Sequence, residues 1–282
     1  MTKFISEISS NHNNSLKRSI KLIRISSEIG FDIVKFQLFK IDQLFSKEIL
    51  KKSKKHRLRK KWELKEKHIP ILAKECKKNN LKFCVTPFYL SAIDIIKPYV
   101  DYIKIASYEI LWEDFLVKCA KTKKPIIIST GMANLQEVRN AVKILKKYGS
   151  KKIIVLHCVS NYPAKLDSLN LSAIGHLRKK IKTPVGWSDH SNDPLVILQS
   201  IEKWKSDFVE MHIDLDGKGY EFNSGHCWLP ERAKKIISFI RKLKVINGKS
   251  KKKPNIHELE ERKFRADPLD GLRPIKKYRK FL

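Results

Sequence analysis

Short apolar runs alternate with amphipathic stretches along the whole chain. In residues 134–148, Leu135, Val138, Val142 and Leu145 recur at the spacing of one helix face. The short apolar runs between turn residues are typical of buried strands. The predicted strands are Lys3–Ile8, Ile33–Phe36, Lys82–Thr86, Tyr102–Ala106, Pro125–Ser129, Lys152–His157, Pro184–Trp187 and Asp207–Ile213. The predicted helices are 15–29, 63–79, 90–97, 112–121, 134–148, 169–181, 194–203 and 230–245.

Strict alternation of strands and helices predicts an α/β fold with a parallel sheet. Eight such units in about 250 residues have the size of a TIM (β/α)8 barrel. An open doubly wound sheet is the alternative, although no GxGxxG fingerprint follows the first strand. We expect a barrel domain at 1–248 and a short basic C-terminal tail at 249–282.

Two stretches interrupt the alternation. Residues 51–68 form a basic run, which predicts either a loop over the active-site face or a solvated helix start. Residues 249–282 are polar, basic and punctuated by proline and glycine, and they predict a tail that packs over the barrel or mediates assembly.

The composition indicates a globular cytoplasmic protein. Hydrophobic residues make up 42% of the 282 residues, and no apolar run approaches the roughly 20 residues that span a membrane. The N-terminal stretch lacks the apolar core of a signal peptide. Five cysteines without a CxxC pair favour reduced thiols in a cytoplasm.

The formal net charge is +31, from 60 basic and 29 acidic residues. A nucleic-acid partner is one explanation for such a charge. The lysines are spread along the chain without an interleaved aromatic stripe, which favours a general lysine preference on solvated faces. We therefore expect no nucleic-acid or membrane partner, and a positive field that attracts a small anionic substrate.

Charged residues stand inside three predicted strands that should be apolar. Glu7, Lys35 and Lys104 occupy these positions, and Glu109 follows the third of them. Because an unpaired buried charge is costly, these groups must pair with each other, a ligand or a metal. The two lysines suit a phosphate or a carboxylate. A Schiff-base lysine of a class I aldolase is an alternative role for either one.

A further pair of strands predicts a metal site. His190 follows the seventh strand, and the eighth carries Glu210 and His212, which face the same side because they are two residues apart. If the strands are parallel neighbours, the two histidines meet at their carboxyl ends. Two imidazoles with carboxylates nearby can hold a divalent metal, and two unrelated polar histidines are the other interpretation.

Small polar groups at other strand ends complete the pattern. They include Thr86, Ser129-Thr130-Gly131, Ser160-Asn161-Tyr162 and Ser188. Turns favour such residues anyway, but together they are consistent with one polar mouth.

These residues carry a resemblance to a known family. The matching motifs are Glu7–Asn13, Val34–Gln37, Thr86–Phe88, Lys104–Glu109, Ser129–Ala133, His157–Pro163, Gly186–His190 and Glu210–His212. In this order they resemble the sialic acid synthase (N-acetylneuraminate synthase) family.

The resemblance implies a TIM-barrel enzyme that condenses phosphoenolpyruvate with an N-acylated amino sugar, such as N-acetylmannosamine, in surface-carbohydrate biosynthesis. The implied products are a sialic-acid-type sugar and phosphate. His190 and His212 would ligate Mn²⁺ or Mg²⁺. Glu7, Glu109 and Glu210 are the candidates for proton transfer. Phosphoenolpyruvate and the sugar would be held by Lys35, Gln37, Thr86, Lys104, Ser107, Asn161, Tyr162 and Ser188.

The chain also departs from the family pattern. We expect a short form without the usual C-terminal antifreeze-like domain. The resemblance also predicts a homodimer, which is common in the family. The glycines that flank the family's Asn-His motif are replaced in Ser9–Asn14. Gly219-Tyr220-Glu221 stands in place of the usual Gly-Pro-Asp and is followed by Ser224–Trp228, a stretch that contacts substrate in the family. These changes leave open a barrel aldolase or lyase on another sugar, or a paralogue with an altered acceptor.

Overall fold

Eight parallel strands close into one barrel in the computed structural model, which describes residues 2–248 and 251–280. The strands are β1 Lys3–Ser9, β2 Ile33–Leu38, β3 Lys82–Pro87, β4 Tyr102–Ile105, β5 Ile126–Ser129, β6 Ile153–His157, β7 Val185–Asp189 and β8 Phe208–His212. Each strand pairs with its neighbours in sequence, and β1 also pairs with β8. The predicted TIM barrel is confirmed, and the open doubly wound sheet is wrong.

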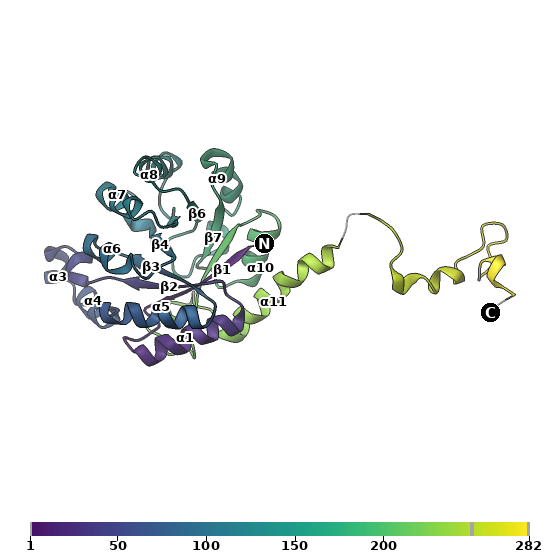
Figure 1. Ribbon diagram of the computed structural model, residues 1–282, viewed down its shortest axis with the longest axis horizontal. Helices are drawn as coiled ribbons and strands as arrows, with labels where there is room; N and C mark the ends of the chain where they lie inside the picture. The colour runs from purple at the N-terminus through teal and green to yellow at the C-terminus, as the bar shows by residue number, and fades with distance from the viewer. Residues whose placement is uncertain (1, 249–250, 281–282) are drawn as a thin grey trace. The chain divides into compact units, whose positions relative to one another are not determined.

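Helices surround the strands on the outside of the barrel (Figure 1). The main helices are α1 Leu16–Ile29, α5 Ile69–Lys78, α6 Leu90–Ile96, α7 Glu113–Lys121, α8 Leu135–Lys147, α9 Ala173–Ile181, α10 Pro194–Glu202 and α11 Pro230–Asn247. Three shorter helices, α2 Ile41–Leu44, α3 Lys47–Lys52 and α4 Lys54–Leu58, lie between β2 and α5.

The helix expected at 63–79 begins six residues later than predicted. Pro70 stands in the first turn of α5, where a proline needs no amide partner. The Glu63 carboxylate instead accepts a hydrogen bond from the Ile41 amide, 2.9 Å away, and so ties residues 41–63 into a folded excursion. The basic run at 51–68 therefore belongs to a structured loop beside the cavity described below.

The barrel interior is layered because side chains two residues apart on a strand face the same side. Its lower layer is one apolar cluster of buried side chains. The cluster comprises Ile5, Ile33, Cys84, Tyr102, Ile127, Ile154, Leu156 and Phe208. Two residues further along four of these strands stand Glu7, Lys35, Lys104 and Glu210, which form a charged layer toward the carboxyl ends.

The chain divides into two compact units, Met1–Arg241 and Lys242–Leu282. The second unit contains short 3-10 turns at Ile256–Glu258, Glu261–Phe264 and Lys276–Tyr278. An ion pair between Arg279 and Asp270 holds its last turn, with 2.7 Å between Nη2 and Oδ1. The predicted boundary between residues 248 and 249 adjoins residues 249–250, which lie outside the described part of the chain.

The cysteines and the helices bear on two expectations from the composition. All five cysteines are buried free thiols, so the prediction of no disulfide framework is confirmed. Within the described residues, the helices are either too short or too polar to cross a lipid bilayer.

Gly186 allows β7 to approach its neighbours, and its replacement provides a test of the packing. A Cβ at this position would lie 2.1 Å from the Phe208 carbonyl oxygen and 2.8 Å from Leu156 Cδ2. We expect Gly186→Ala to lower the free energy of unfolding by about 1–3 kcal/mol, because the added methyl group overpacks the core. The midpoint of urea unfolding measures this loss.

Gly175→Ala in α9 is the matched control. There the new Cβ meets only the Trp204 ring, 3.3 Å away, and alanine has a helix propensity about 1 kcal/mol better than glycine. A small change is expected for this variant. Equal midpoints for the two variants would contradict the packing argument.

Candidate active site

A network of four buried charges crosses the barrel interior. Lys35 Nζ lies 2.9 Å from Glu7 Oε2 and 3.0 Å from Glu210 Oε1. Lys104 Nζ donates to both oxygens of Glu210, each at 2.9 Å. The four side chains come from β1, β2, β4 and β8, and each is at most 5% exposed. Each of the four charged groups is therefore paired with an oppositely charged group inside the barrel, as the cost of an unpaired buried charge predicts.

Two neutral groups complete this charged layer. Ser188 Oγ donates to Glu210 Oε1 at 2.9 Å, and Gln37 Nε2 donates to Glu7 Oε1 at 2.8 Å. Register explains the first contact, because Ser188 stands opposite Glu210 in the sheet. Glu7 stands opposite Lys35, and Gln37 follows two residues further along β2. These side chains therefore stand on paired strands, whose hydrogen bonds hold their backbones in place.

Burial separates the protonation behaviour of the two carboxylates. Desolvation raises the pKa of Glu7 to about 7, although Lys35 opposes the shift. Burial would also raise the pKa of Glu210, but the ammonium groups of Lys104 and Lys35 hold it well below its usual range. Glu7 can therefore take up and release a proton near neutral pH, whereas Glu210 stays ionised.

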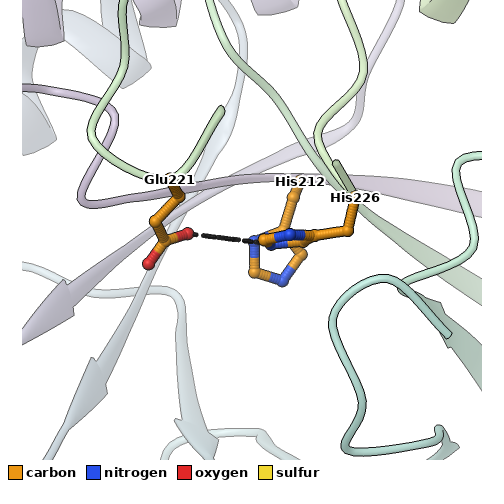
Figure 2. Close-up of side chains that lie close together, drawn as sticks. All are labelled: His212, Glu221 and His226. Carbon is orange, nitrogen blue, oxygen red and sulfur yellow. Dashed lines mark hydrogen bonds and ion pairs between the residues drawn. The ribbon is translucent and has the colours of Figure 1, made fainter. Parts of the chain in front are cut away.

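Histidines and a carboxylate gather above this layer, at the carboxyl end of β8. His226 Nε2 lies 3.2 Å from His212 Nδ1, and Glu221 Oε2 lies 3.5 Å from the same His212 nitrogen. One donor atom of each of these three residues lies within 4.8 Å of the others. Figure 2 shows the three side chains pointing toward one another from β8 and the loop that follows it.

His190 lies beside this cluster. Its ring centroid is 5.2 Å from that of His212 and 6.0 Å from that of His226. The expected meeting of His190 and His212 is therefore present. His190 Nδ1 contacts the Val159 carbonyl oxygen at 2.6 Å, which leaves Nε2 available for a ligand.

The chemistry of these donors fits a divalent cation. Burial lowers the pKa of His190, His212 and His226 to about 3 each, so the rings are neutral, as metal ligands must be. His226 Nδ1 and Glu221 Oε2 are buried without a hydrogen-bond partner in the described part of the chain. Buried polar groups are normally hydrogen-bonded, and a bound cation would supply such atoms with a partner.

The loop after β8 is held in place by the turn after β1. Asn11 Oδ1 accepts a hydrogen bond from the Glu221 amide at 2.9 Å, and Asn11 Nδ2 donates to the Ile213 carbonyl at 3.0 Å. Ser9 Oγ donates to Glu221 Oε1 at 2.5 Å, which leaves Oε2 to face the histidines. Ser9 has a φ of 48°, a conformation that favours glycine. Ser9 therefore orients Glu221 from a backbone position at which the family resemblance predicts glycine.

A cavity of about 520 Å³ opens over the cluster. Its inner wall includes His212, Glu221 and His226, and its sides include Glu109 and Tyr162. Its volume lies within the range of small-molecule sites. The Tyr162 ring packs against His190 and His226, with centroids 4.3 and 4.9 Å apart.

The remaining predicted residues divide into three groups. Gln37, Glu109 and Tyr162 line the cavity. Thr86, Ser107 and Ser188 are buried at strand ends, and Thr86 Oγ1 has no hydrogen-bond partner among the described residues. Asn161 is exposed, and its Oδ1 accepts a hydrogen bond from the Tyr162 amide, so the structure does not bring its side chain to the others.

Sequence reasoning did not identify Glu221 and His226 as partners of His212. Both lie after β8, in Gly219–Glu221 and Ser224–Trp228, where the sequence departs from the family pattern and where substrate contacts are expected, but neither residue is among the predicted metal ligands. Their position after the last strand was the available signal, because active-site residues of such barrels stand in these loops. Arg59, which belongs to the basic run 51–68, also lines the cavity.

The fold and the site together define a TIM-barrel protein with a polar, partly charged cavity at the carboxyl ends of its strands. Such cavities are where barrels of this kind carry their chemistry. The chain belongs to the NeuB family, which matches residues 22–252.

Named relatives share most of the chain. The N,N'-diacetyllegionaminic acid synthase of Legionella pneumophila is 34% identical over 275 residues, which cover 92% of this chain and 77% of that protein. A pseudaminic acid synthase of Campylobacter jejuni is 31% identical and covers 97% of this chain and 82% of that protein. The solved N-acetylneuraminic acid synthetase of Leptospira borgpetersenii superposes with a TM-score of 0.81 at 29% identity, covering 92% of this chain and 90% of that one.

The buried Glu109 gives a pH-dependent prediction. Burial raises its pKa to about 8, from 4.5. Between these values the native state holds a proton that the unfolded state has lost, so stability falls as pH rises, by about 1.4 kcal/mol per pH unit. We expect the stability of the wild type to fall relative to Glu109→Gln by up to about 3 kcal/mol between pH 5.5 and 7.5, measured by urea unfolding.

Glu113→Gln, at an exposed position in the first turn of α7, controls for the loss of a charge alone. Its stability is expected to follow the wild-type pH profile. A Glu109→Gln profile parallel to the wild type would mean that Glu109 ionises normally.

Proposed function

We propose that this protein condenses phosphoenolpyruvate with an N-acylated amino sugar, in a metal-dependent reaction that yields a nonulosonic acid and phosphate. One observation carries the proposal. Glu210 and His212 stand two residues apart on β8, so the layer with two buried lysines lies directly beneath the histidine–carboxylate cluster. A site for an anion therefore adjoins a site suited to a cation.

The names of the relatives support the same chemistry. Two are synthases of legionaminic and pseudaminic acids, and a structural relative is a sialic acid synthetase. We infer that this chain works in the biosynthesis of a surface carbohydrate, in the cytoplasm. A homodimer stays a prediction from the family resemblance.

The charged layer of Glu7, Lys35, Lys104 and Glu210 would hold phosphoenolpyruvate. Lys35 and Lys104 supply positive charge for its phosphate and carboxylate groups. Thr86, Ser107 and Ser188 are buried hydroxyls at neighbouring strand ends, and Thr86 Oγ1 has no partner among the described residues. When Glu7 is protonated, the two lysine ammonium groups are balanced by the Glu210 carboxylate alone. The layer then has a net positive charge, which attracts an anion.

The reaction balances as follows. The methylene carbon of phosphoenolpyruvate forms a bond to the aldehyde carbon of the open-chain sugar, whose oxygen takes up a proton. Water then adds to the former enol carbon, and the carbon–oxygen bond to phosphate breaks. The water oxygen becomes the new keto oxygen, and its two protons balance the one taken up by the sugar oxygen and the one that leaves with phosphate. Glu7 is the best-suited carrier for one of these protons because its pKa is about 7. Glu109, with a pKa of about 8, is the second candidate, whereas Glu210 stays ionised and orients the lysines.

The cluster above would hold the cation. His190 and His212 are the proposed ligands, and Glu221 and His226 add two more donors. When bound, a divalent cation such as Mn²⁺ or Mg²⁺ acts as a Lewis acid on the sugar carbonyl. Tyr162 covers the histidine rings and limits the access of water.

Phosphate release tests the proposed reaction directly. We expect the protein to release phosphate from phosphoenolpyruvate with Mn²⁺ only when an acceptor is present, and EDTA should abolish the release. The screen includes N-acetylmannosamine and related 2-acetamido and 2,4-diacetamido hexoses. Calorimetry with phosphoenolpyruvate is run in parallel.

Phosphoenolpyruvate binding without release with any sugar would indicate a paralogue with an altered acceptor. Release that resists EDTA, together with borohydride trapping on a lysine, would favour a Schiff-base aldolase and reject the proposal.

Metal binding can be measured without turnover. We expect His212→Ala and Glu221→Gln each to weaken Mn²⁺ binding by more than about 100-fold, because loss of a ligand exceeds the 10–100-fold cost of losing an outer contact. Calorimetry measures the affinity, and circular dichroism checks that the variants are folded. His176→Ala, at an exposed position in α9, is the control and should bind Mn²⁺ normally.

Ser9→Ala tests the orientation of Glu221. Ser9 contacts Glu221 Oε1 and not the histidines, so its loss should weaken Mn²⁺ binding by about 10-fold, less than loss of Glu221 itself. Unchanged affinity in Glu221→Gln would remove Glu221 from the ligand set.

A further inference from the structure

His190 and His226 reach the cluster from two different loops. His190 directly follows the last residue of β7, whereas His226 stands 14 residues beyond His212, the last residue of β8. The sheet places the ends of β7 and β8 side by side, but it does not set the course of so long a loop. Contacts outside the sheet must therefore bring His226 back to the strand ends.

Asp189, between β7 and His190, is a buried carboxylate that accepts hydrogen bonds at both oxygens. Its Oδ1 accepts from Trp187 Nε1 at 3.2 Å and from the amide and hydroxyl of Ser191 at 3.2 and 2.6 Å. Its Oδ2 accepts from the Asn192 amide and from Trp228 Nε1, each at 3.1 Å. An ionised carboxylate only accepts, so it matches this set of donors. Trp228 alone among these partners comes from the loop after β8.

Trp228 fixes the chain on the C-terminal side of His226, two residues away. Its amide donates to the His212 carbonyl oxygen at 2.7 Å, and its own carbonyl accepts from the Asp214 amide at 3.0 Å. The backbone of Trp228 is thus joined to the end of β8, while its buried indole is joined to Asp189 at the end of β7. One residue therefore ties the two strand ends together beside His226.

Asn192 fixes the chain on the N-terminal side of His226. Its Nδ2 donates to the carbonyl oxygen of Gly225, the residue directly before His226, at 3.4 Å. Because the Asn192 amide donates to Asp189, this second contact depends on the same carboxylate. His226 thus stands between two residues, Gly225 and Trp228, that are both connected to Asp189.

We propose that Asp189 is a positioning residue that sets His226 against His190 and thereby sets the cation affinity of the cluster. Within the described residues, Asp189 makes no hydrogen bond to either imidazole, so it acts through the backbone of the two loops. Only the identity of the ligand, a divalent cation, rests on the proposed function. The connection between the loops is a property of the metal-free chain.

Mn²⁺ binding to the otherwise metal-free protein, measured by calorimetry, tests the role of Asp189. We expect Asp189→Asn to weaken binding by about 10- to 100-fold, the cost of losing a contact outside the ligand set. An amide offers an acceptor on one side only, so the donors on the other side lose their partner. Trp228→Phe removes the indole donor alone and should weaken Mn²⁺ binding by about 10-fold, the lower end of the same range.

Trp187→Phe is the matched control. It also removes a buried indole donor to Asp189, but Trp187 belongs to β7 itself, so the connection between the two loops remains. This variant should lose stability in urea, as Trp228→Phe does, and keep the Mn²⁺ affinity of the wild type. The comparison separates a lost connection from a lost hydrogen bond.

A spectroscopic measurement tests the connection without metal. Asp189→Asn alters no aromatic ring, so a change in the Cε1–H NMR signal of His226 in the metal-free protein reports a change in the position of that ring. We expect this signal to shift or broaden, and the signal of His176, exposed in α9, to stay unchanged. Trp228→Phe provides the same comparison if Asp189→Asn does not fold.

Two results would overturn the positioning role. One is a lower unfolding midpoint with unchanged Mn²⁺ affinity and an unchanged His226 signal, because Asp189 would then only stabilise the fold. The other is an equal loss of Mn²⁺ affinity in Trp187→Phe and Trp228→Phe. If the wild type binds no Mn²⁺, the proposed metal-dependent function fails, and the His226 signal alone decides whether Asp189 positions the ring.

Discussion

The ion-pair network of Glu7, Lys35, Lys104 and Glu210 is the constraint on which the rest of the molecule depends. Each charge is buried, so removal of one partner leaves another uncompensated in a low-dielectric interior. The contacts exist only because four strands enter the barrel in one register, and a shift of one residue would turn these side chains away from the interior. The network thus specifies the strand register, and the register in turn aligns the strand ends above it.

Closure of the barrel also positions the cation cluster. β1 pairs with β8, which places the turn after β1 beside the loop after β8. Ser9 and Asn11 in that turn hold Glu221 in the loop by hydrogen bonds that join residues about 210 positions apart in the chain. The strand pairing that closes the fold is therefore the same pairing that brings Glu221 to His212.

The site combines groups in different protonation states within one interior. The histidines are neutral because burial disfavours their cationic form, whereas Glu210 stays ionised because two lysines offset its desolvation. Glu7 titrates near neutral pH because burial outweighs the effect of Lys35. This separation of pKa values is the pattern expected where one group must carry a proton while others bind fixed charges.

The sequence by itself determined the number and order of the strands and the order of the eight main helices, because local periodicity reports which side of each element is buried. It also indicated that Glu7, Lys35 and Lys104 need partners, and that His190 and His212 meet, since both conclusions follow from strand alternation and strand ends. Only the tertiary structure decided that Glu221 and His226 join His212, and that Arg59 reaches the cavity. Loops have no periodicity, and contacts with residues distant in the chain set their course. Asn11 fixes one loop and the Glu63–Ile41 hydrogen bond fixes the other, and neither contact can be read from local sequence.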